Sequence, residues 1–102
     1  MFLIQLLLPL YDNAGTPIDG ACYAQTRTEL IERFGGLTAY SRAPADGLWK
    51  PDGGAAVRDE LVVVEIMADV LDEAWWKDYR HRLEVRFRQQ SILVRALHAT
   101  LL

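Results

Sequence analysis

Apolar residues are distributed along the chain in two ways, as short continuous runs and as stripes with helical spacing. Residues 2–8 are apolar except for one glutamine, and residues 57–68 contain a run of leucine, valine, isoleucine and methionine broken by one glutamate. Runs of this length, apolar on both faces, are typical of central β-strands. Residues 37–42 and 91–98 predict two further strands. A segment rich in Gly, Pro and Asp, residues 43–56, predicts a long connection.

A helix is predicted over residues 20–34. Asp19 is a plausible N-cap, and Gly35-Gly36 is expected to end the helix because glycine accepts the left-handed backbone conformation found there. Glu29 and Glu32 are expected to face water. The inward stripe is expected to contain Tyr23, Arg27 (through its aliphatic stem), Leu30, Ile31 and Phe34.

A second helix is predicted over about 70–89. Asp69 and Asp72 are both plausible N-caps, and acidic residues there suit the helix dipole. Aromatic and leucine side chains recur at steps of three and four residues, which predicts one buried face. This inward set is Trp76, Tyr79, Leu83 and Phe87.

The order strand, helix, strand, strand, helix, strand predicts an α+β fold of the ferredoxin-like βαββαβ type. Right-handed crossovers would place both helices on one face of a four-stranded antiparallel sheet, with the first and third strands in its centre. The whole chain, residues 1–102, is expected to form one domain, since its length suits a single core.

The face of the sheet without helices is expected to be unusually apolar. Gln5 and Glu65 interrupt the two central strands at their middles and are expected to point together away from the helices. So much apolar surface on a chain of this size predicts a homodimer that packs through the sheet. The sequence leaves the partner of Gln5 and Glu65 open among Tyr40, Ser41, Arg42 and Arg95.

Glu65 is the main candidate for chemistry, because a carboxylate in an apolar strand needs a charge partner, a raised pKa or water. It either sets the dimer register through hydrogen bonds or an ion pair, or acts in a pocket as a ligand-binding group or general base, or is simply exposed. The proposed ligand-binding residues around it are Gln5, Tyr40, Arg42 and Trp49.

Composition and motifs exclude several classes of function. The formal charge is −3, so a broad nucleic-acid interface is not expected. Phosphate-binding loops, nucleophile elbows and paired-cysteine motifs are missing, and Cys22, His81 and His98 lack metal-ligand spacing. We therefore expect no cofactor and no metal. The apolar start lacks a basic region and is too short to cross a bilayer, so a cytoplasmic protein without membrane contact is expected.

Two stretches resemble a small bacterial family with a ferredoxin-like fold of the dimeric α+β barrel kind. They are RFGGLTAYSRAPADGLW, residues 33–49, and YRHRLEVRFRQQSILV, residues 79–94. The resemblance implies the fold and dimerisation. It implies no reaction, because the family has no established activity.

Two classes of function follow from these observations. The first is a dimeric protein that binds a small apolar or aromatic molecule, with a cofactor-independent enzyme of the dimeric α+β barrel type included. The second is a non-catalytic interaction or assembly module that uses the open sheet face. Whether the protein is an enzyme is left open by the sequence.

Overall fold

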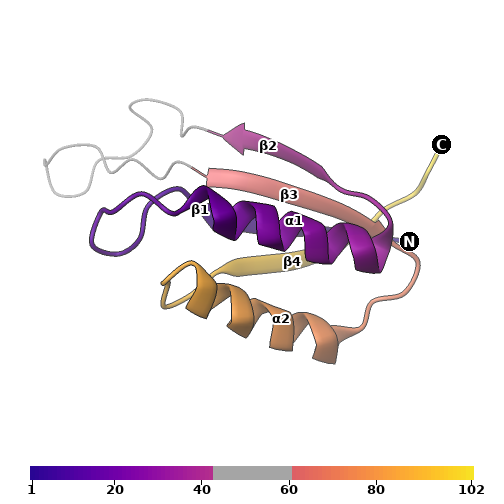
Figure 1. Ribbon diagram of the computed structural model, residues 1–102. Helices are drawn as coiled ribbons and strands as arrows, with labels where there is room; N and C mark the ends of the chain where they lie inside the picture. Colours follow the sequence, from indigo (N-terminus) through magenta and orange to yellow (C-terminus); the bar gives the residue numbers. More distant parts are fainter. Residues whose placement is uncertain (43–60) are drawn as a thin grey trace, which may run out of the picture.

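The computed structural model describes residues 1–42 and 61–102, with side chains omitted for residues 39–42. Two helices and four strands follow one another along the chain (Figure 1). In chain order they are β1 (Phe2–Pro9), α1 (Gly20–Phe34), β2 (Thr38–Arg42), β3 (Leu61–Ala68), α2 (Glu73–Arg86) and β4 (Leu93–His98). No helix in the described ranges is long and apolar enough to cross a membrane.

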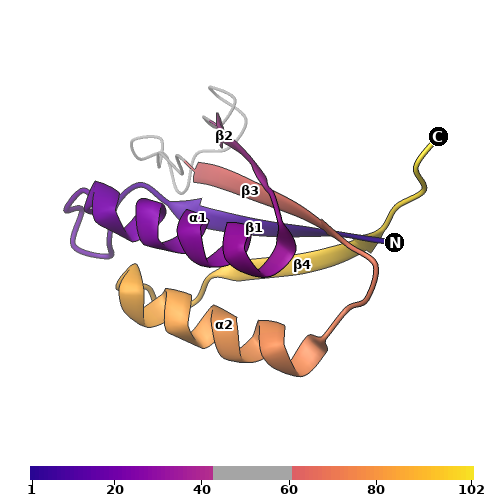
Figure 2. The same cartoon turned by 45° about the vertical axis from the view of Figure 1, so that its right-hand side comes forward.

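The strands form one sheet in the order β2-β3-β1-β4, and each neighbouring pair is antiparallel. The predicted central pair is confirmed, because β1 and β3 pair along their full length, from Phe2 opposite Ala68 to Pro9 opposite Leu61. Both helices cover the same face of the sheet (Figures 1 and 2). The opposite face, here called the open face, has no helix over it.

The predicted fold class needs a correction. We expected a ferredoxin-like βαββαβ unit with a complete four-stranded sheet. Side chains are described along the full length of three antiparallel strands, β3, β1 and β4, whereas β2 adds five residues at one edge, and only the side chain of Thr38 is described there. An edge strand is hydrogen-bonded on one side only, so β3 alone fixes the backbone of β2. The structure thus shows an α+β fold with an antiparallel sheet, and the ferredoxin-like assignment is not carried further.

Alternation along the central strands builds the core between sheet and helices. Ile4, Leu6 and Leu8 of β1 are almost fully buried, and Val64 and Ile66 of β3 lie beside them. The inward set predicted for α2 is confirmed, since all four of its members are buried. The core cluster consists of Ile4, Leu6, Leu8, Ile18, Leu30, Val64, Ile66, Trp76, Tyr79, Leu83, Phe87 and Ile92.

The helix ends follow local capping chemistry. The carboxylate of Asp19 accepts a hydrogen bond from the backbone N–H of Ala21, and Gly35 ends α1 with a φ of 84°, in the left-handed region. Helix α2 is shorter than predicted, because Asp72 caps it by accepting from the N–H of Trp75, and Phe87 is its C-cap. For α1, in contrast, both ends lie where they were predicted, at Asp19 and Gly35.

The prediction that Glu29 faces water is wrong. The guanidinium of Arg86 in α2 donates two hydrogen bonds to the Glu29 carboxylate, at 2.8 and 2.9 Å. The Tyr79 hydroxyl donates to the same carboxylate at 2.8 Å, and Arg86 also donates to the hydroxyl of Thr26. This set, here called the interhelix clamp, buries Thr26 in α1, whereas the predicted inward residue Ile31 is 43% exposed.

The interhelix clamp changes the acidity of its members. Burial alone would raise the pKa of Glu29, but hydrogen bonds from Arg86 and Tyr79, together with the nearby charges of Arg86 and Arg82, hold that pKa below its ordinary value of 4.5. Burial, and then the Glu29 carboxylate, raise the pKa of Tyr79 to about 12. At neutral pH the clamp therefore holds a charged carboxylate and a neutral phenol.

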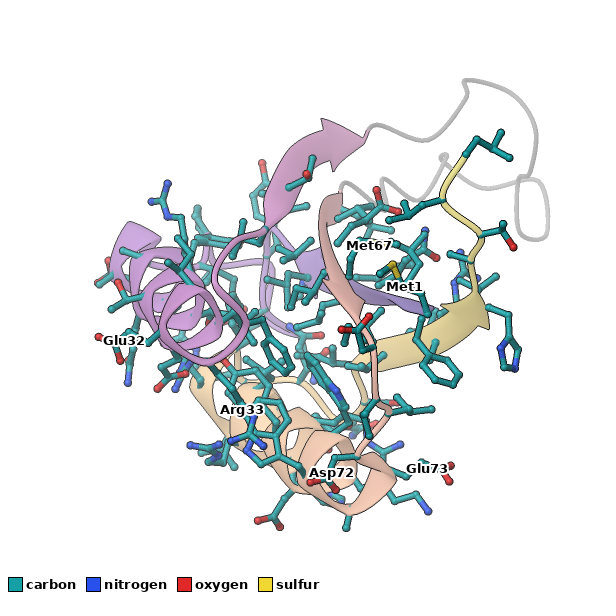
Figure 3. The ribbon with its side chains drawn as sticks, turned by 90° about the vertical axis from the view of Figure 1, so that its right-hand side faces the viewer. Met1, Glu32, Arg33, Met67, Asp72 and Glu73 are labelled. Carbon is teal, nitrogen blue, oxygen red and sulfur yellow. The ribbon has the colours of Figure 1, made fainter. Side chains whose placement is uncertain are left out.

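An aromatic cluster joins the end of α1 to the start of α2. The ring of Phe34 stacks on Trp76, with centroids 5.3 Å apart, and Trp75 stacks on Tyr79 at 4.8 Å. The Arg33 guanidinium lies 4.1 Å from the centroid of Trp75. Figure 3 shows Arg33 between the two helices, above the start of α2. The cluster fixes where α1 ends and hence where the chain turns towards β2.

We predict that Arg86→Met destabilises the protein by about 1–3 kcal/mol, because the Glu29 carboxylate loses a partner that donates two hydrogen bonds to it in a partly buried site. Arg88→Met is the matched control. It breaks a pair with Asp12, at 3.3 Å, in which the Arg88 side chain is 59% exposed, and is expected to cost less than about 1 kcal/mol. Urea unfolding of the three proteins measures both values. Equal losses would contradict the assigned role of the clamp.

We also predict an acid-sensitive stability that disappears in Glu29→Gln. Because the folded-state pKa of Glu29 lies below its unfolded value, its contribution is complete above about pH 4.5 and is lost as the pH falls through the folded pKa. Urea unfolding across this acidic range should give a smaller difference between wild type and Glu29→Gln at the lowest pH. A difference that does not change with pH would refute the prediction.

Candidate functional site

A polar row crosses the open face of the sheet. Gln5 of β1 lies opposite Glu65 of β3 on one side and opposite Arg95 of β4 on the other. Thr38 of β2 lies opposite Glu65 and extends the row. Because Gln5 and Glu65 alternate with buried residues of their own strands, both side chains lie on the face without helices.

Hydrogen bonds connect three members of this row. The Nε of Arg95 donates to the Oε1 of Gln5 at 2.7 Å, and the Nε2 of Gln5 donates to the Oε2 of Glu65 at 2.6 Å. The Gln5 amide therefore links the guanidinium of Arg95 to the carboxylate of Glu65, although these two charged groups are not hydrogen-bonded to each other. Such charge-assisted hydrogen bonds stabilise a carboxylate at a site partly withdrawn from water.

Two apolar rows flank the polar row. In the first row, Leu3 of β1 lies between Leu97 of β4 and Met67 of β3. In the second row, Leu7 of β1 lies between Leu93 of β4 and Val63 of β3. Met67, Leu93 and Leu97 are 39%, 50% and 44% exposed. Figure 3 shows Met67 on the side of the sheet away from both helices. Neighbouring large apolar side chains with this much exposure are a common feature of binding surfaces.

An open hollow of about 370 Å³ lies where the α1–β2 connection meets this face. Glu65 and Met67 form part of its wall, together with Thr38 and the ring of Phe34. The aromatic cluster holds Phe34, and the left-handed turn at Gly35 redirects the chain from α1 towards β2. The complete lining is Phe34, Gly35, Gly36, Leu37, Thr38, Glu65 and Met67.

Two other hollows lie on the helix side of the sheet. One, of about 190 Å³, lies between α1 and β3 and is almost entirely apolar; the Tyr23 hydroxyl in its wall already donates to the carbonyl of Pro9. The other, of about 170 Å³, lies between α2 and β4, and Lys77 and Arg80 contribute cations to it. Neither contains a carboxylate within an apolar strand.

The structure brings together part of the predicted site. Gln5 and Glu65 are in contact, and of the four partners considered, Arg95 joins them, through Gln5. The backbones of Tyr40 and Arg42 lie opposite Val63 and Leu61, but their side chains, like all of Trp49, lie outside the described residues.

Of the residues that line the hollow, Glu65 alone was predicted as a site residue; those that were missed include Phe34, Thr38 and Met67. Phe34 and Met67 carry no signal beyond their apolar character. Thr38 lies two residues after Gly36, and this position at the start of a strand beside β3 was the available signal. Within residues 1–42 and 61–102, no three His, Cys, Asp or Glu side chains gather in a way that could hold a metal ion.

Comparison with known proteins gives a fold and no family. No family model matches the chain, and no curated protein is similar to it in sequence. Among solved structures, a phage SAM lyase in complex with S-methyl-5'-thioadenosine is similar, with a TM-score of 0.61 and 13% sequence identity. The match covers 94% of this chain and 79% of the lyase chain. At this identity the likeness shows a shared fold only.

We predict that Gln5 and Glu65 are energetically coupled. A double-mutant cycle of Gln5→Ala and Glu65→Ala should give a coupling energy of about 1 kcal/mol, because each single change leaves the other side chain without its hydrogen bond in a half-buried row. Urea unfolding of the four proteins measures it. Strictly additive losses would show that the 2.6 Å contact contributes nothing to stability.

Proposed function

We propose that the protein binds a small molecule in the hollow beside Glu65. The ligand has an apolar or aromatic body and a hydrogen-bonding or cationic group that meets the carboxylate. The observation that carries the proposal is the position of Glu65, a carboxylate between two apolar rows and in the wall of a hollow large enough for a compact ligand.

The wall of the hollow offers complementary groups to such a molecule. Phe34 and Met67 supply aromatic and thioether surface, which suits a flat ring. Thr38 offers a hydroxyl that can donate or accept. One oxygen of Glu65 accepts from Gln5, and the other has no hydrogen bond among the described residues. A ligand donor or cation can therefore meet the carboxylate without displacing Gln5.

An adenosine that carries a thioether or sulfonium group is the class we propose first. The similar phage protein is a SAM lyase in complex with S-methyl-5'-thioadenosine, which makes these two compounds reasonable probes. Their adenine ring suits the apolar wall, and ribose hydroxyls are donors for a carboxylate. The sulfonium of SAM carries a positive charge, whereas the thioether of S-methyl-5'-thioadenosine is neutral. The pair therefore tests the charge of Glu65 directly.

Glu65 is also the residue we propose for any chemistry on the bound molecule. Its carboxylate would stabilise a positive charge on the ligand or accept a proton as a general base, without a cofactor. Gln5 would hold its orientation. Tyr40, Arg42 and Trp49 keep their proposed roles in shaping the ligand site. Incubation with SAM, followed by analysis for released S-methyl-5'-thioadenosine, separates a catalyst from a binding protein.

The second candidate function is an interaction or assembly module. It is favoured by exposed apolar residues of the open face, Met67, Leu93 and Leu97, of which Leu93 and Leu97 lie outside the hollow. In that case the open face binds the surface of another protein, and neither SAM nor S-methyl-5'-thioadenosine binds.

For the first candidate, we predict that SAM and S-methyl-5'-thioadenosine raise the melting temperature of the wild type. Glu65→Gln should weaken SAM binding at least about tenfold, because a hydrogen bond or contact to a charged group is lost, and should weaken the neutral thioether less. Thermal shift identifies binding, and titration calorimetry gives the affinities.

Two further variants locate the site. Glu73→Gln is the matched control, because Glu73 lines the hollow between α2 and β4, and it should leave both affinities unchanged. Met67→Trp should abolish binding, since the indole ring of the tryptophan would fill the hollow beside Glu65. Failure of both compounds to stabilise the wild type would refute the proposal of a sulfur-substituted adenosine as the ligand. Equal effects of the two glutamate changes would refute the site.

A further inference from the structure

We propose that a second copy of this chain covers the open face, and that Arg95 of the partner subunit pairs with Glu65. The proposed dimer is independent of the proposed function, except that closure of the hollow by the second copy rests on it. It is carried by a charge pattern that is complementary to itself.

The polar row has opposite charges at equal steps from its centre. Arg95 lies one strand to one side of Gln5, and Glu65 lies one strand to the other side. A twofold axis that runs parallel to β1 between two facing sheets, over Gln5, reverses the row. Glu65 then faces Arg95 of the partner subunit, and Arg95 faces the partner's Glu65.

The side chains can span such an interface. Facing sheets pack about 10 Å apart, a distance that an arginine and a glutamate pointing towards each other can bridge. Arg95 uses its Nε for Gln5, and its two terminal nitrogens have no hydrogen bond among the described residues. Either nitrogen can donate to the carboxylate of the partner's Glu65 while Gln5 keeps its own hydrogen bond to it.

The apolar rows agree with the same axis. Because the axis is parallel to the strands, each row faces its own copy, so that Leu97 faces Met67 of the partner subunit and Leu93 faces the partner's Val63. Leucines of β1 meet their own copies on the axis. The arrangement covers Met67, Leu93 and Leu97, three large apolar residues that the single chain leaves substantially exposed.

This pairing also completes the ligand site. The hollow beside Glu65 is open in the single chain, and its rim at Met67 lies on the face that the partner would cover. A ligand would then be enclosed between subunits.

Charge reversal and mixing test the proposal. Glu65→Arg alone places like charges opposite Arg95 of the partner subunit, and Arg95→Glu alone places like charges opposite the partner's Glu65. Each single variant should dimerise at least about a hundredfold more weakly than wild type. An equimolar mixture of the two variants should form heterodimers, because every facing pair is again of opposite charge. Sedimentation equilibrium and native mass spectrometry, without ligand, measure both.

Three further variants test the pairing of Glu65 with Arg95 of the partner subunit. The double variant Glu65→Arg/Arg95→Glu should regain the homodimer. Glu65→Gln and Arg95→Gln should each weaken the dimer. These two neutral variants replace the charge-reversal variants in the test if circular dichroism shows that a charge-reversal variant does not fold. A monomeric wild type at high concentration, single variants that dimerise like wild type, or folded variants that do not associate on mixing would each overturn it. Ligand binding by a monomer would leave the proposed function standing alone.

Discussion

The register of β1 against β3 is the constraint on which the other features depend. Eight consecutive residues of each strand pair, and the register places Gln5 directly opposite Glu65. A slip of one residue would move the side chains of one strand to the opposite face, so that a carboxylate would enter the core and its apolar neighbours would leave it. The polar pair therefore does more than break two apolar runs: it makes alternative registers costly.

The two helices complete this arrangement from one side only. The interhelix clamp, in which Arg86 and Tyr79 hold the carboxylate of Glu29, joins α1 to the second half of α2. The aromatic cluster joins them again where Phe34 stacks on Trp76. The chain leaves α1 at a fixed place, and the hollow beside Glu65 forms there. Contacts on the covered face thus determine the shape of a site that opens on the other face.

Local features of the sequence were predictive where local physics decides. The ends of α1 at Asp19 and Gly35, and the inward face of α2, follow from capping and periodicity alone. Glu29 was misplaced for the opposite reason. On its own helix it lies among polar residues, and only the approach of Arg86, 57 positions later, turns it into a partly buried partner. Pattern along one helix contains no information about the helix that packs against it.

For the candidate site, the sequence alone determined that two polar side chains interrupt the two most apolar strands, because period-two alternation makes Gln5 and Glu65 stand out from their neighbours. It could not choose among Tyr40, Ser41, Arg42 and Arg95 as their partner. That choice depends on strand order and register, which are set by long-range pairing across a connection whose length fixes neither. Only the tertiary structure placed Arg95 beside Gln5, and only it gathered Phe34, Thr38 and Met67 around the carboxylate.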